Sequence, residues 1–169
     1  MDKKPNMTKD TVPEDFTLPL VIVDALPVLF FGGSTILLGL LFGRIFFLIG
    51  ALLCFWAGAA KVIWKLLVVT RKKNVWWLFL QMRIVMPVGF ALMLLSVVLR
   101  LNTIRLSAVW AAILSFPSVL FFAAGVIGMV LMGVFASRLN SSDVRANWIE
   151  QLTNALAQAA VFIGLLLLF

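Results

Sequence analysis

The chain contains no histidine, no tyrosine and only one cysteine, Cys54, among its 169 residues. Histidine is the commonest general base near neutral pH and the commonest zinc or haem ligand, so its absence argues against most hydrolytic and metal-dependent sites. A single cysteine has no partner for a disulfide within the chain. We therefore expect no catalytic residue, no metal and no cofactor, and we expect Cys54 to be a small packing residue.

Charged residues are also scarce, at 12% of the chain, whereas 63% of the residues are hydrophobic. This composition, with its long apolar runs, is typical of a polytopic membrane protein. The formal net charge is +7, but the basic residues flank apolar runs. Membrane topology and anionic lipid headgroups explain such a pattern better than nucleic acid does. We expect the partner to be a bilayer with anionic headgroups, and no nucleic acid.

The apolar runs predict an all-α fold, a compact bundle of five transmembrane helices in a single domain over residues 17–169. A polar segment with two prolines, residues 1–16, precedes it and is expected to be a flexible cytoplasmic tail. Proline within a helix removes a backbone donor and bends the helix, so Pro27, Pro87 and Pro117 predict kinks in the first, third and fourth spans. The predicted spans cover residues 17–42, 45–70, 75–99, 106–136 and 148–169.

Five spans place the two ends of the chain on opposite sides of the membrane. Most of the basic residues then fall on the side of the N-terminus: Lys3, Lys4, Lys9, Lys65, Arg71, Lys72, Lys73, Arg138 and Arg145. The other side receives Arg44, Arg100 and Arg105. Because basic loops stay in the cytoplasm, we expect a multi-pass protein of the plasma (inner) membrane with a cytoplasmic N-terminus.

Three charged residues lie inside the apolar spans, namely Asp24, Lys61 and Arg83. At 1.5 Å per residue, each is expected roughly 10–15 Å below the cytoplasmic interface. A charge in hydrocarbon is costly and marks a functional site by default. The alternatives are that Lys61 and Lys65 extend to the headgroups, that Arg83 begins a shorter span, or that Asp24 forms only a structural ion pair with Lys61 or Arg83.

The fifth span carries a polar stripe, Glu150, Asn154 and Gln158, at a spacing of four residues. Such a stripe faces the bundle interior or a partner helix, so it lines a site or forms an oligomer seam. Pro27 and Pro87 leave the carbonyls of Val23 and Arg83 without their helical donors. We expect Pro27, Pro87 and Glu150 to gate or orient a site that binds its substrate through five residues, namely Asp24, Lys61, Arg83, Asn154 and Gln158.

Three functions fit this pattern. The first is transport or permeation of a small anionic or zwitterionic solute through a cytoplasm-facing polar vestibule, in a homo-oligomer or a larger membrane complex. The second is a non-catalytic membrane subunit or scaffold, in which the intramembrane charges form a structural latch. The third, a membrane enzyme that modifies a lipid or isoprenoid, ranks last because the sequence shows no paired acids and no histidine. We therefore expect that the protein is not an enzyme.

Overall fold

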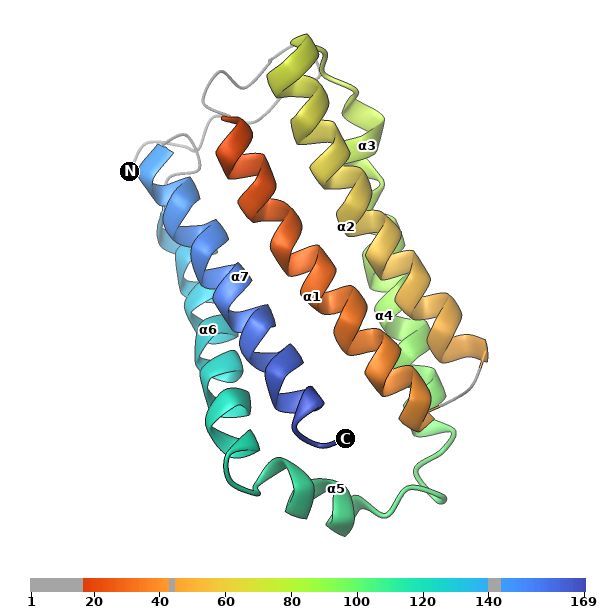
Figure 1. The fold of residues 1–169 in the computed structure, drawn as a ribbon. Helices are drawn as coiled ribbons and strands as arrows, with labels where there is room; N and C mark the ends of the chain where they lie inside the picture. Colours follow the sequence, from red (N-terminus) through yellow and green to blue (C-terminus); the bar gives the residue numbers. More distant parts are fainter. Residues whose placement is uncertain (1–16, 43–44, 140–143) are drawn as a thin grey trace.

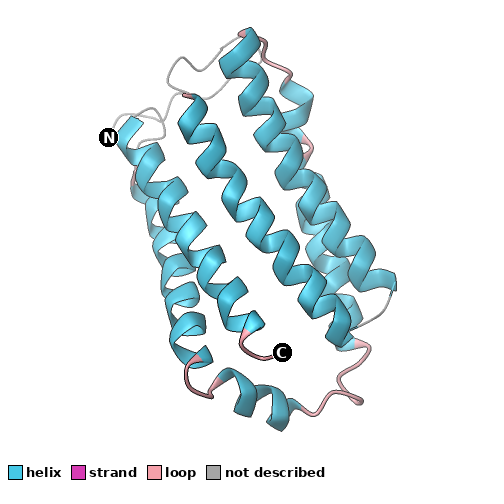
Figure 2. Cartoon of the chain, in the orientation of Figure 1, coloured by secondary structure: helices cyan, strands magenta, loops and turns pink. Residues whose placement is uncertain are grey.

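The computed structural model describes residues 17–42, 45–139 and 144–169, and within them the chain forms seven helices and no strand (Figures 1 and 2). The helices are α1 (Leu18–Phe42), α2 (Ile45–Arg71), α3 (Trp76–Leu80), α4 (Met82–Val98), α5 (Leu106–Ile113), α6 (Ser118–Arg138) and α7 (Val144–Leu166). The predicted all-α fold is confirmed for these residues. The tail predicted over residues 1–16 lies outside them.

In the described part of the chain, five helical segments are long and apolar enough to cross a membrane, as predicted. They are Leu18–Leu40, Ile45–Arg71, Trp76–Val98, Ser118–Phe135 and Val144–Leu166. The third segment contains both α3 and α4, which are separated only by Gln81. Because a hydrocarbon core needs about 20 residues of helix, these lengths suit a multi-pass membrane protein.

The fourth predicted span, residues 106–136, differs from the structure. It consists of two helices, α5 and α6, separated by residues 114–117. Pro117 has no backbone N–H and disfavours a helical conformation in the residue before it, so one helix ends before it and the other begins after it. The helix that is long and apolar enough to cross a membrane therefore starts at Ser118, and α5 lies across the end of the bundle (Figure 1).

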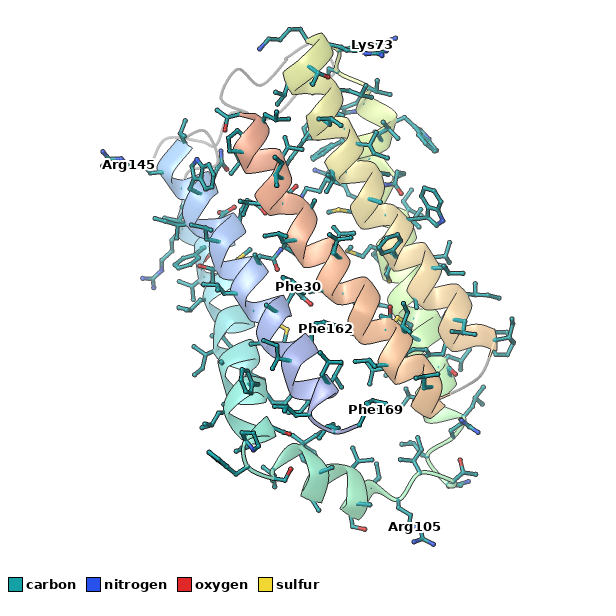
Figure 3. The ribbon with its side chains drawn as sticks, in the orientation of Figure 1. Phe30, Lys73, Arg105, Arg145, Phe162 and Phe169 are labelled. Carbon is teal, nitrogen blue, oxygen red and sulfur yellow. The ribbon has the colours of Figure 1, made fainter. Side chains whose placement is uncertain are left out.

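α1 occupies the middle of the bundle, between α2 on one side and α7 on the other (Figure 1). A pair of glycines lets both neighbours approach. A Cβ on Gly32 would lie 3.0 Å from the Phe55 ring of α2, and a Cβ on Gly33 would lie 2.6 Å from the Phe162 ring of α7. Phe30 also packs against Phe162, with ring centroids 6.0 Å apart (Figure 3). Small residues thus set the position of α1, as is usual in membrane bundles.

α2 packs most closely on α4 at a contact between backbones. A Cβ on Gly89 would lie 2.7 Å from the carbonyl oxygen of Gly50 and 2.6 Å from Sγ of Cys54. The Cys54 thiol donates to the carbonyl of Met86 at 3.6 Å. The expectation that Cys54 is a packing residue agrees with its burial here. α6 packs on α7 in a similar way, through Gly125 and Gly128.

The outward faces of the spans are apolar, as expected of surfaces that contact lipid. Leu40, Trp77 and Leu156 each expose about 70% of their surface or more, at 72%, 71% and 71%. Pro27 and Pro87 both lie inside helices that continue past them. The predicted kinks at these two positions stay a prediction.

Candidate functional site

A buried ion pair joins α1 to α2. Nζ of Lys65 lies 2.8 Å from Oδ2 of Asp24, and the two side chains expose only 6% and 7% of their surface. Asp24 is six residues from the start of α1, and Lys65 is six residues from the end of α2. Both therefore lie roughly 9 Å from the same end of the bundle. A buried charge needs such a partner because hydrocarbon does not solvate it.

Two further charges act on this pair. Lys65 is attracted by Glu150 of α7 and repelled by Lys61, which lies one helical turn before it on α2. Two acids and two lysines from three helices thus gather at one end of the bundle. This is the end that also carries Lys73 and Arg145, whereas Arg105 lies at the other (Figure 3).

A pocket of about 290 Å³ lies beside the ion pair, between α1, α2, α4 and α7. Its polar lining consists of Asp24, Lys61, Asn154 and Gln158. The rest of the lining is apolar and includes Phe31 and Phe90, whose rings meet edge to face at 6.0 Å. The volume of about 290 Å³ is just below the range for small-molecule sites, which begins near 300 Å³.

The polar groups of this pocket have unused hydrogen-bonding capacity. Lys61, Asn154 and Gln158 are half-buried, and none of them has a hydrogen bond or ion pair with another residue of the described chain. An ammonium offers three donors, and each carboxamide offers two donors and an acceptor. Half-buried donors are stabilised by a ligand or by water, so the pocket can accept an anionic group of a solute.

Four of the five predicted substrate-binding residues thus line one pocket, and the fifth, Arg83, does not. Arg83 is exposed, and its guanidinium lies over the Phe79 ring, 5.6 Å from the centroid. On α4 the residues that line the pocket are Met82, Met86 and Phe90. Arg83 follows Met82 by one residue, which turns it about 100° away from the pocket. Of the residues expected to gate the site, Pro27 lines the pocket, whereas Pro87 is exposed.

The partner of Asp24 is Lys65, neither Lys61 nor Arg83. Because α1 ends at Phe42 and α2 begins at Ile45, a hairpin of the two helices pairs positions that sum to 87 and places Asp24 opposite position 63. Lys61 and Lys65 lie two residues to either side of that position and share one helical face. The register of the hairpin therefore limits the ion-pair partner of Asp24 to one of these two lysines. The packing of α1 on α2 then selects Lys65.

Among residues 17–42, 45–139 and 144–169, no three His, Cys, Asp or Glu side chains converge in a group that could hold a metal ion. Comparisons of the whole chain with protein-family models, with curated proteins and with solved structures found no match. The chemistry of the pocket is therefore the best indication of function.

Proposed function

We propose that the protein binds a small anionic or zwitterionic solute in this pocket and carries it across the membrane. The observation that supports the proposal is the convergence of Lys61, Asn154 and Gln158 on one cavity, with donors that no other described residue uses. An ammonium and two carboxamides suit a carboxylate or a phosphate, because hydrogen bonds to ionised groups are the stronger ones. Asp24, at the same pocket, suits the ammonium of a zwitterion.

The apolar part of the lining supports a solute with an apolar body beside its charged head. Phe31, Met86 and Phe90 contribute this part of the pocket. Pro27 lies in the wall, three residues after Asp24, and it leaves the carbonyl of Val23 without a helical donor. In our proposal a bend of α1 at Pro27 adjusts the width of the pocket.

We place the pocket in the cytoplasmic half of a plasma (inner) membrane. Lys72, Lys73, Arg138 and Arg145 lie at the pocket's end of the bundle, and the sequence bias toward basic residues on this side supports a cytoplasmic orientation. The pocket extends from Asp24 past the middle of the bundle to Phe31, Phe90 and Gln158, but it does not reach the opposite end. In our proposal a homo-oligomer or a larger membrane complex completes the pathway.

A specific observation also favours the second candidate, a structural latch in a non-catalytic subunit. The Asp24–Lys65 pair is buried, and its charged atoms lie 2.8 Å apart, which is what a latch requires. The two candidate functions involve different lysines. Lys65 forms the ion pair of the latch, and Lys61 lines the pocket.

Solute flux into proteoliposomes tests the proposal, with a panel of small carboxylates, phosphates and amino acids. Lys61→Met removes the ammonium from the pocket and leaves the Asp24–Lys65 pair intact. A hydrogen bond to a charged group contributes about 1.5–3 kcal/mol, so we expect flux of the accepted solute to fall roughly tenfold or more. The melting temperature should change little.

Lys73→Met is the matched control, because it removes one positive charge from an exposed position at the same end of the bundle. It should transport as the wild type does. Equal flux in Lys61→Met and Lys73→Met would refute a binding role for Lys61. Wild-type protein that moves no solute of the panel, but melts far lower once Asp24 is replaced, would support the latch instead.

A further inference from the structure

A second cavity, of about 530 Å³, lies at the end of the bundle opposite the polar pocket. Its walls are apolar and come from four helices, with Leu38 of α1, Ile113 of α5, Phe122 of α6 and Leu165 of α7 among them. The volume is within the range of about 300–1,000 Å³ that small-molecule sites occupy. An apolar cavity of this size at the end of a membrane bundle suits a hydrocarbon chain.

One charged residue, Arg100, lines this cavity, and Thr103 lies beside it. The segment that carries them is a well-bonded turn, because the carbonyl of Arg100 accepts from the backbone N–H of Thr103 at 2.8 Å and of Ile104 at 3.1 Å. The turn fixes Arg100 between the end of α4 and the start of α5. A guanidinium has five donors in a planar fork, so it binds a phosphate group even when it has another contact.

Among the side chains of the described residues around the cavity, the charged ones are all positive. The sequence has no Asp or Glu between Asp24 and Asp143, and the last acidic residue is Glu150. The second half of α1, the turn, α5 and the start of α6 therefore contain no acidic residue. In the described residues the cations of this end are Arg100, which lines the cavity, and Arg105, which Figure 3 labels at this end.

The helix α5 forms part of the wall and has the properties of a segment at the membrane interface. It lies across the ends of the membrane-crossing helices (Figure 1). Val109 and Ile113 line the cavity, whereas Trp110 exposes 61% of its surface. Tryptophan favours the headgroup level of a bilayer, so the mouth of the cavity at Arg100 and Thr103 is at the depth of lipid phosphates.

From these observations we propose that the cavity binds one anionic phospholipid, with an acyl chain between α1, α5, α6 and α7 and the phosphate at Arg100. Charge complementarity selects an anionic headgroup over a zwitterionic one, and the apolar walls select a lipid over a free anion. This site is separate from the polar pocket and does not depend on the proposed transport.

Native mass spectrometry of the detergent-solubilised protein tests the proposal. The probes are phosphatidylglycerol and phosphatidylcholine with the same acyl chains, together with glycerol 3-phosphate as the headgroup without a chain. We expect one bound phosphatidylglycerol, held roughly tenfold more tightly than phosphatidylcholine, and no binding of glycerol 3-phosphate. Equal binding of the two lipids, or competition by glycerol 3-phosphate alone, would overturn it.

Two variants distinguish the contribution of the lipid headgroup to binding from that of the acyl chain. Arg100→Gln should reduce the preference for phosphatidylglycerol to near unity, whereas Arg138→Gln, an exposed arginine at the other end of the bundle, should leave it unchanged. Ile113→Trp places a larger side chain in the cavity and should weaken both lipids. If Arg100→Gln does not fold, the wild-type lipid ratio and Ile113→Trp decide the question. A dimer that Ile113→Trp dissociates, with no lipid bound, would assign the cavity to a second copy.

Discussion

At the scale of single residues, the buried ion pair of Asp24 with Lys65 joins α1 to α2. Removing one partner leaves the other charge buried and uncompensated, which costs about 3–5 kcal/mol in proteins. We expect Asp24→Asn to lower the free energy of unfolding by about 3 kcal/mol, since the field of Glu150 still acts on Lys65. Reversible unfolding in mixed micelles measures this loss.

The double variant Asp24→Leu with Lys65→Met tests the cause. It removes both charges and should recover most of the stability, because a buried ion pair is often no better than apolar side chains of similar volume. A double variant as unstable as Asp24→Asn would show that the loss came from packing and not from the unpaired charge. Arg83→Leu is a useful reference, because its exposed stacking on Phe79 contributes only about 0.5–1 kcal/mol.

At the scale of helices, the contact between α2 and α4 depends on glycine at position 89. Alanine there would place Cβ 2.7 Å from the Gly50 carbonyl oxygen and 2.6 Å from Sγ of Cys54. Backbone atoms cannot rotate away as side chains do, so the two helices must separate. We expect Gly89→Ala to lower the free energy of unfolding by about 1–3 kcal/mol, the usual cost of overpacking, in the same unfolding assay.

Gly133→Ala is the matched control for this prediction. Gly133 is also a helical glycine, on α6, but nothing lies within 4 Å of a Cβ built there. Alanine favours a helix over glycine by up to about 1 kcal/mol, so this variant should be neutral or slightly more stable. A similar loss in both variants would mean that helix propensity in the bundle, and not the close contact, controls the result.

At the scale of the whole molecule, topology can be tested from two ends of one span. Lys73 and Asn102 flank the segment Trp76–Val98, and both are exposed. We expect a membrane-impermeant maleimide to label Lys73→Cys from one side of sealed vesicles and Asn102→Cys only from the other. The native Cys54 is buried and should stay unlabelled. Labelling of both positions from one side would contradict the five-span arrangement.

The sequence predicted the five apolar segments because length and hydropathy are local properties. It did not predict the separate helix α5, since its apolar residues continue the run that leads into α6 and only Pro117 marks the division. The polar pocket was predicted in outline, through Asp24, Lys61, Asn154 and Gln158. Arg83 was expected at the same site, but the structure places it outside the pocket. Depth alone does not determine which side of a helix faces the interior, and a shift of one residue changes that side.

The burial of Cys54 has a practical consequence. It is the chain's only thiol, and it lies 1% exposed where α2 and α4 are in closest contact. Cys54 also lines the polar pocket, so a thiol reagent reaches it when the pocket or the contact between α2 and α4 opens, and the modification rate of the unaltered protein reports that opening. The effects of solute, of lipid and of each variant that adds no cysteine can thus be compared through the modification rate of one native thiol.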